Sequence, residues 1–195
     1  MERQLSTDSA SQSEILSVLG PEGPSVAYID LEASGLGDKS WPIEIGWAKR
    51  GAVPESIIIR PHADWPHGAW DPSAEALHGL SMEVLNEHGL DVVGACKKLN
   101  DALAGETVYS DAPDWDGYWL YRLHQAARMR QTFNLVHFAE LMPPIGLTDK
   151  LMLVARTNSL APHTHRAADD VRHMQVLHAL AIRHGSGKTD SDLRG

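Results

Sequence analysis

The sequence predicts an α/β fold built on a mixed sheet, and three observations lead to that prediction. Three short segments rich in apolar and β-branched residues follow one another with only turns between them, which is typical of an antiparallel meander. Helical and extended patterns then alternate, as expected where later strands join the same sheet through helices. The length of 195 residues, with 43% hydrophobic and 22% charged residues, suits a single globular domain.

The elements are expected in the following order. The first three strands cover residues 26–31, 43–49 and 56–60, with glycines at the first turn. A loop rich in proline, tryptophan and histidine follows and contains a short helix at 74–80. Apolar spacing then predicts, in turn, a helix at 90–103, a strand at 107–110, a helix at 114–130, a segment at 134–142 that is strand-like at its start, and helices at 147–156 and 164–184.

The ends of the chain are expected to lie outside this domain. Ser11 and Glu14 form a capping-box pattern, so residues 1–24 are predicted to be an N-terminal extension with a short helix. Residues 25–185 form the domain, and 186–195 are a polar, disordered tail. One cysteine permits no internal disulfide, and no segment resembles a signal peptide or a membrane span. The sequence therefore predicts a cytoplasmic protein without a membrane partner.

The net charge of −9 limits how the chain can interact with nucleic acid. It argues against a protein that coats nucleic acid through nonspecific basic contacts. It does not exclude an enzyme that acts on nucleic acid, because bound divalent cations can reverse the field at one site.

Four carboxylates stand where a folded chain seldom places unpaired charge. Asp30 and Glu32 are two residues apart in an apolar strand pattern, so their side chains share one face, with Cα atoms about 7 Å apart. Asp116 and Asp170 each fall on the apolar stripe of a predicted helix, which charged residues normally avoid. A helix N-terminus, or a strand face open to water, accounts for any one of them taken alone.

Taken together, the four carboxylates indicate a metal site. If they meet at one edge of the sheet, their mutual repulsion is on the order of several kcal/mol at an effective dielectric constant of about 20. Divalent cations remove that penalty, and oxygen ligands without cysteine favour Mg²⁺ or Mn²⁺. A pair of such ions about 3.5–4 Å apart is the usual arrangement for phosphoryl displacement.

His165 is the candidate general base. It precedes Asp170 by five residues, so the two cannot share one helix face, and His165 must lie at or before the start of the helix. A loop position suits a base that approaches water after substrate has bound. The alternative is an ordinary surface histidine.

Three motifs resemble those of the DEDD exonucleases, in the subgroup whose fifth residue is the histidine of an H-x-x-x-x-D motif. They are "DLEASGL" at 30–36, "SDAPDWD" at 110–116 and "HRAADD" at 165–170. The second motif departs from the family, because Ser110 and Asp111 replace a common His-Asn pair and Trp115 replaces phenylalanine. Asp111 is therefore a rival to Asp116.

The resemblance implies a ribonuclease H-like fold with a mixed five-stranded sheet, three antiparallel strands first, flanked by helices. It also implies site residues. Asp30, Glu32, Asp116 and Asp170 would be ligands of two Mg²⁺ or Mn²⁺ ions, and His165 would be the general base. The residues expected to contact the substrate are Ser34, Gly35, Leu36, His78 and Trp115.

By the same resemblance, the chain would be a metal-dependent 3′–5′ exonuclease that releases nucleoside monophosphates from single-stranded RNA or DNA. A catalytically weak module of the same fold that binds nucleic acid or a partner is the first alternative. An endonuclease of the wider ribonuclease H-like group is the second. The sequence does not separate RNA from DNA, since that choice depends on contacts to the 2′-hydroxyl. Dimerisation is common among such enzymes, so a homodimer is compatible with the resemblance.

Overall fold

The structure is a computed structural model that describes Leu19 and residues 25–185. The predicted N-terminal helix and C-terminal tail lie outside these residues. The described chain forms a five-stranded mixed sheet in the order β3-β2-β1-β4-β5. The strands are β1 (Ala27–Ala33), β2 (Pro42–Lys49), β3 (Glu55–Ile58), β4 (Thr107–Ser110) and β5 (Asn134–His137). The first three pair antiparallel and β4 and β5 join in parallel, as the sequence predicted.

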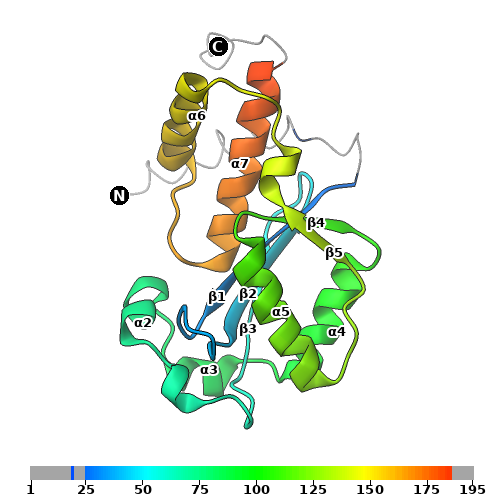
Figure 1. Cartoon of the computed structure of the whole chain (residues 1–195), viewed down its shortest axis with the longest axis vertical. Helices are drawn as coiled ribbons and strands as arrows, with labels where there is room; N and C mark the ends of the chain where they lie inside the picture. The colour runs from blue at the N-terminus through cyan, green and yellow to red at the C-terminus, as the bar shows by residue number, and fades with distance from the viewer. Residues whose placement is uncertain (1–18, 20–24, 186–195) are drawn as a thin grey trace, which may run out of the picture.

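Helices cover both faces of the sheet (Figure 1). Two pairs pack together: α6 with α7, and α4 with α5. The α-helices in the described residues are α2 (Pro72–His78), α3 (Met82–His88), α4 (Val92–Leu103), α5 (Pro113–Ala127), α6 (Leu147–Leu160) and α7 (Ala167–Gly185). Two 3₁₀ turns are added at His67–Ala69 and Phe138–Leu141. In these residues, no helix combines the length and the apolar character that crossing a membrane requires.

The alternation of β1 divides the core into two layers. Ala27, Ile29 and Leu31 pack in the larger cluster, which also holds the apolar stripes of α4 and α5. Tyr28 faces the other way and packs against Val171 of α7. Asp30 and Glu32 have the same parity as Tyr28, so they continue the α7 face toward the end of the strand.

The sheet leaves an opening where β1 and β4 part. Their parallel pairing covers only Ala27 with Val108 and Tyr28 with Tyr109. Beyond it β1 runs on to Ala33, whereas β4 ends at Ser110 and the chain turns into α5. The carboxyl ends of parallel strands at such a junction are where α/β sheets commonly bind ligands.

Helix α3 and the 3₁₀ turn at His67–Ala69 were not predicted, and both are held by local contacts. Ser81 caps α3, since its hydroxyl accepts a hydrogen bond from the Val84 amide at 3.3 Å. Asp71 caps α2 in the same way through Ser73, and Gly79 ends α2 in the left-handed conformation with φ of 69°. These two capped helices bring Leu77 and His78 back toward the end of β1.

Candidate active site

A cavity of about 520 Å³ opens at the carboxyl ends of β1 and β4. Every residue expected in the site lines it, with the exception of Ser34. The residues that the sequence placed there and the structure brings together are Asp30, Glu32, Gly35, Leu36, His78, Trp115, Asp116, His165 and Asp170. They come from β1, the loop after it, and helices α2, α5 and α7 with the loop before α7.

The acidic side chains of this cavity form two groups. Glu32, His165 and Asp170 place one ligand atom each within 4.8 Å of one another. Asp30, Asp111 and Asp116 do the same. The two carboxylates of β1 therefore belong to different groups, Asp30 to one and Glu32 to the other. Their two-residue spacing places them side by side along the same face of the strand.

Asp116 is held in a buried position by α5. It lies in the first turn of that helix and is 1% exposed, at the end of the stripe that continues through Trp119 and Leu120 into the core. The Ser110 hydroxyl, from the end of β4, donates a hydrogen bond to its carboxylate. Ser110 stands where the resembling family commonly has histidine. Its hydrogen bond shows that this departure still leaves Asp116 held in place.

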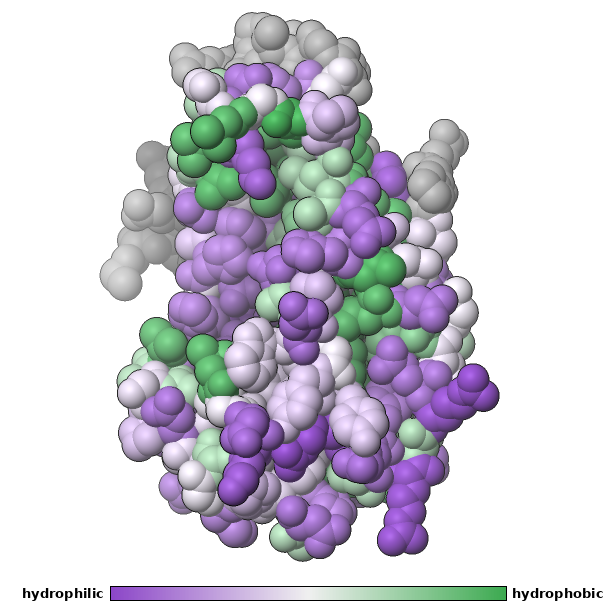
Figure 2. All heavy atoms as spheres, viewed as in Figure 1, coloured by the Kyte–Doolittle hydropathy of each residue, from purple (hydrophilic) through white to green (hydrophobic). Residues whose placement is uncertain are grey.

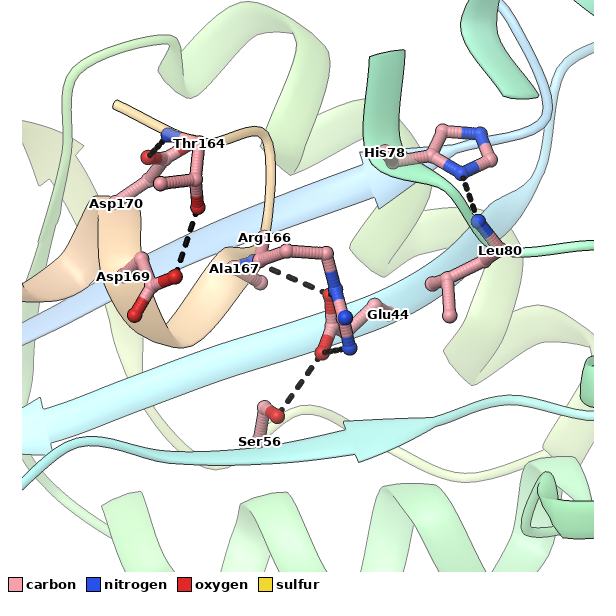
Figure 3. A network of polar contacts seen from close by, with 9 residues as sticks. All are labelled: Glu44, Ser56, His78, Leu80, Thr164, Arg166, Ala167, Asp169 and Asp170. Carbon is pink, nitrogen blue, oxygen red and sulfur yellow. Dashed lines mark hydrogen bonds and ion pairs between the residues drawn. The ribbon is translucent and has the colours of Figure 1, made fainter. Parts of the chain in front are cut away.

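The first turn of α7 is fastened to β2 by Glu44 (Figure 3). Glu44 is 1% exposed, and its carboxylate accepts hydrogen bonds from Arg166 Nε at 2.9 Å and Nη2 at 3.0 Å. It also accepts from the Ala167 amide at 3.2 Å and the Ser56 hydroxyl at 3.0 Å. This bidentate arrangement fixes the chain between His165 and Asp170 against the sheet.

Gly46 explains why α7 can approach so closely. It pairs with Asp30 across the β1–β2 ladder. A Cβ atom at position 46 would lie 2.4 Å from the carbonyl carbon of Ala167. The absence of a side chain at Gly46 therefore lets the backbone of β2 touch the start of the helix that carries Asp170.

His165 lies on the loop before α7, as the sequence predicted. It is exposed and has a positive φ of 56°, a conformation that a residue with a side chain seldom adopts. Such backbone strain is concentrated at functional sites. The next residue, Arg166, donates from its guanidinium to Glu44, and the Ala167 amide donates to the same carboxylate, so these contacts hold the end of the loop in place.

His163 also faces the cavity, which sequence reasoning missed. Its Nδ1 lies 3.2 Å from Asp170 Oδ1, and its ring stacks on His173 with centroids 3.7 Å apart. The Thr164 amide donates to the same Asp170 oxygen at 3.1 Å. The sequence holds only a weak signal for this role, namely a second histidine two positions before His165.

Burial, together with neighbouring negative charges, raises the pKa of three carboxyls in the cavity. Burial raises the pKa of Asp30 well above its usual range, and Asp116 and Glu32 raise it further. Burial, followed by the charge of Asp170, raises the pKa of Glu32 to about 7. Burial raises the pKa of Asp116 to about 8, although the hydrogen bond from Ser110 opposes that shift. Without cations, these carboxyls therefore hold protons near neutral pH.

The donor set fits hard divalent cations. Asp30 Oδ2 is buried and has no hydrogen-bond partner among the described residues, so an acceptor aimed at the site is left unsatisfied. Five carboxylates and His165 offer oxygen and imidazole ligands without cysteine, a set that suits Mg²⁺ or Mn²⁺. Asp111, the rival of Asp116, lies in the same group as Asp116 and does not replace it.

Apolar and aromatic side chains form the mouth of the cavity. Leu36 is 70% exposed, and Trp115 is 39% exposed and stacks on Trp119 with ring centroids 5.5 Å apart. His78 is buried, and burial lowers its pKa, so the ring is neutral. Its Nδ1 accepts from the Leu80 amide at 3.0 Å, so Nε2 carries the proton, and no described residue accepts a hydrogen bond from it.

Ser34 supports the β1–β2 hairpin and does not line the cavity. It is fully buried, and its amide donates to the Trp41 carbonyl at 2.9 Å while its hydroxyl accepts from the Trp41 amide at 3.1 Å. The Ser34 side chain is therefore engaged inside the protein, and its contact with substrate stays a prediction. Gly35 does line the cavity, and a Cβ there would lie 3.0 Å from Cβ of Asp71.

The chain has no match among models of protein families, and no curated protein matches it. Solved structures do match. Exonuclease I from Methylocaldum szegediense superposes with a TM-score of 0.64 and 17% identity, over 85% of this chain and 42% of that one. Exonuclease I of E. coli in complex with a dT13 oligonucleotide gives 0.63 and 11% identity, over 88% and 43%. The zinc-bound form of the E. coli exonuclease I–ssDNA complex gives 0.62 and 11%, over 86% and 42%.

The chain therefore spans about two-fifths of the length of the exonuclease I structures that it matches. At these identities the likeness shows the fold. The chain has the ribonuclease H-like fold that it shares with exonuclease I, a mixed five-stranded sheet flanked by helices.

Proposed function

We propose that the protein is a metal-dependent 3′–5′ exonuclease that hydrolyses the terminal phosphodiester bond of single-stranded nucleic acid. The observation that carries the proposal is the gathering of Asp30, Glu32, Asp116, Asp170 and His165 around one cavity, from segments far apart in the sequence. The fold shared with exonuclease I, including its ssDNA complexes, supports the same reaction class.

Asp30, Glu32, Asp116 and Asp170 would hold two Mg²⁺ or Mn²⁺ ions, with Asp111 close enough to assist. Divalent cations bound there would supply Lewis-acid activation of water and neutralise charge at the leaving oxygen. The raised pKa values of Glu32 and Asp116 mean that cation binding must displace protons from the carboxyls.

His165 would accept a proton from the attacking water. It is exposed on the loop before α7 and lies within ligand distance of Glu32 and Asp170, so it can reach water held between them. The bond between phosphorus and the 3′ oxygen of the preceding nucleotide breaks as the oxygen of water bonds to phosphorus. The products are a nucleoside monophosphate and a strand shorter by one nucleotide.

The mouth of the cavity would hold the terminal nucleotide. Leu36 and Trp115 offer apolar and aromatic surface for its base. The unpaired Nε2–H of His78 offers one hydrogen bond to an acceptor of the nucleotide. Since base stacking tolerates every base, we expect weak sequence preference.

A panel of 5′-labelled RNA and DNA oligonucleotides, incubated with Mg²⁺ or Mn²⁺, tests the proposal. We expect a ladder of products that shorten from the 3′ end, no reaction with EDTA, and loss of activity in Asp116→Asn. A folded protein that binds strands without shortening them would support the noncatalytic alternative. Cleavage of a circular strand would identify an endonuclease, because a circle has no end.

A further inference from the structure

A second cavity lies beside α5. Its volume is about 800 Å³, and none of its lining residues lines the acidic cavity. One wall is formed by α5 and the residue that ends it, and the other by the segment around Trp65. Its principal lining residues are Trp65, Tyr118, Tyr121, Arg122, Gln125 and Arg128.

The two cavities lie along one face of α5. Trp115, Tyr118, Arg122 and Gln125 follow one another at spacings of three, four and three residues, which places them on a single helix face. Trp115 lines the acidic cavity and the other three line the second one. At 1.5 Å per residue, Arg122 lies about 10 Å along the helix axis from Trp115.

The β1–β2 loop provides a second connection. Leu36 in this loop lines the acidic cavity. The Tyr118 hydroxyl donates a hydrogen bond to the Asp38 carbonyl, two residues further on. This hydrogen bond thus links the loop that lines the acidic cavity to a residue that lines the second cavity.

The second cavity combines aromatic rings with unpaired positive charge. Tyr121 is 61% exposed, and the Arg122 guanidinium lies 5.8 Å from the centre of the Tyr118 ring. In the part of the chain that the structure describes, neither Arg122 nor Arg128 forms an ion pair with a carboxylate. Asp64 also lines the cavity, but its side chain is 90% exposed and lies 3.7 Å from His62.

The backbone at Arg128 is a separate observation. Arg128 ends α5 with φ of 52° and ψ of 38°, in the left-handed conformation that normally selects glycine. An arginine here is less favourable for the fold than glycine would be. Backbone strain of this kind clusters at ligand-binding sites, so it agrees with a role for Arg128 in contacting a ligand.

Figure 2 shows the same surface from outside. Pale aromatic side chains gather over α5, with strongly hydrophilic side chains between them. Alternating rings and cations are the features by which proteins bind single-stranded nucleic acid without regard to sequence. In a protein of net charge −9, such a surface is a local exception.

We propose that this second cavity binds the part of a single-stranded polynucleotide that precedes the terminal nucleotide. Bases stack on Tyr118 and Tyr121, and phosphates contact Arg122 and Arg128. The proposal rests on the proposed exonuclease function for the position of the 3′ end, whereas binding of the strand itself can be measured without hydrolysis.

Equilibrium binding of labelled DNA and RNA strands of two and ten nucleotides tests the proposal, in an Asp116→Asn background with Mg²⁺. We expect the ten-nucleotide strand to bind more tightly than the dinucleotide. Tyr121→Ala should weaken binding of the longer strand by roughly tenfold and leave the dinucleotide unaffected. Arg122→Gln should make the dependence of log K on log salt shallower by about 0.7, the value for one lost phosphate contact on a single strand.

Arg128→Gly and Arg156→Gln complete the set. Glycine at position 128 suits the left-handed backbone, so the Tm should rise while binding of the longer strand weakens, which excludes unfolding as the cause. Arg156 is exposed on α6, at the other end of the molecule in Figure 1, and its replacement removes one positive charge without touching the cavity. Arg156→Gln should bind both strands as the background does.

The outcomes separate this proposal from the proposed function. One outcome is that wild-type protein shortens strands, while the three cavity variants still bind the ten-nucleotide strand more tightly than the dinucleotide by the same factor as the background. In that case the second cavity does not bind the strand, and the exonuclease function stands. A second outcome is that the protein never hydrolyses a strand, yet these variants lose the tighter binding of the ten-nucleotide strand. In that case the second cavity binds the strand, and the exonuclease function fails. If no strand binds at all, both are overturned.

Discussion

Individual carboxylates show a conflict between folding and function. Asp116 is placed by an apolar stripe that favours its burial, and burial raises its pKa to about 8. Asp30 is half-buried, and its Oδ2 atom is buried without a hydrogen-bond partner in the part of the chain that the structure describes. The fold thus maintains unfavourable charges that a cation would compensate, which is the usual relation between a strained site and its ligand.

Asp116→Asn tests this conflict. Loss of even a group that only supports a metal ligand typically costs about 10- to 100-fold, so we expect activity to fall by at least about 100-fold. Because the Asp116 carboxyl of the metal-free wild type is already uncharged near pH 7, the neutral amide should leave the metal-free Tm equal to that of the wild type or above it. Asp114→Asn is the matched control, since Asp114 is exposed in the same helix turn and does not line the cavity. A large fall in the metal-free Tm of Asp116→Asn alone would contradict the argument.

The pH dependence of stability follows from the raised pKa values. An unfolded chain loses its carboxyl protons near pH 4, whereas the folded protein keeps those of Glu32 and Asp116 until about pH 7 and 8. Between these limits the folded state binds more protons, so stability falls as pH rises. In EDTA we expect the Tm to decline from roughly pH 5 to 8, with a contribution from Glu32 on the order of 3 kcal/mol.

Calorimetric scans of wild type and Glu32→Gln at several pH values provide the measurement. The variant should show a shallower decline, because one of the titrating groups is gone. A Tm that rises across this interval in the wild type would show that the site carboxyls are ionised and stabilising without cations.

Sequence reasoning reached these carboxylates because each occupies a position that periodicity reserves for apolar side chains. It could not place His163, since the approach of its ring to Asp170 depends on how the loop before α7 folds. It favoured Asp116 over Asp111, because only Asp116 lies on a helical stripe, and it did not foresee that the two would lie in one group. Asp111 lies in an irregular turn, where no period predicts the direction of a side chain.

At the scale of elements, the contact between β2 and α7 positions half of the site. Glu44 and Gly46 lie two residues apart on β2, so both face the start of α7. Glu44 binds the Arg166 side chain and the Ala167 amide. Gly46 has no side chain and so lets the backbones of β2 and α7 approach closely. The sequence predicted both elements but gave no reason to pair them, because Glu44 reads as an ordinary strand residue until its partner is known.

Gly46→Ala should separate these elements. A methyl group 2.4 Å from the Ala167 carbonyl carbon forces α7 to shift, and overpacking of this kind costs about 1–3 kcal/mol. We expect a lower Tm and a fall in kcat, because Asp170 and His165 move with the helix. Gly68→Ala, where a Cβ would meet nothing within 4 Å, is the control for adding a methyl group. Equal Tm and kcat values in the two variants would contradict the close approach.

A double-mutant cycle of Glu44→Gln and Arg166→Gln measures the ion pair. Glu44 is buried, but the Arg166 side chain is 42% exposed, so water weakens the interaction. We expect a coupling free energy of about 1–2 kcal/mol from urea unfolding. Strictly additive effects would mean that the pair does not fasten α7.

At the scale of the whole molecule, the strand order converts a local pattern into a site. Because β1 lies at the centre of the sheet, its carboxyl end is flanked by β2, α5 and α7. The α/β class and the mixed sheet were predictable, since the first strands are apolar and helices α4, α5 and α7 each carry a buried stripe. The short helix α3 was not, because seven residues with a single buried leucine show no period.

Cation binding should stabilise the whole fold. A ligand that binds only the folded state adds about 2.7 kcal/mol at 100 times its Kd. We expect Mn²⁺ to raise the Tm of the wild type in a concentration-dependent way. Asp30→Asn should abolish that shift, and Asp114→Asn should retain it. An equal shift in wild type and Asp30→Asn would place the cation elsewhere.

The closed base of the β1–β2 hairpin has a consequence for protein engineering. Hydrogen bonds between Ser34 and Trp41 hold β1 and β2 together at this point. The indole Nε1 of Trp119, from α5, also donates to the Ser40 hydroxyl at 2.8 Å. Residues 36–39 are exposed beyond this clamp. Lengthening such a tip costs little entropy once its base is fixed. Loops grafted between residues 36 and 39 should therefore reshape the entrance to the acidic cavity, while the sheet and helices that hold the carboxylates keep their positions.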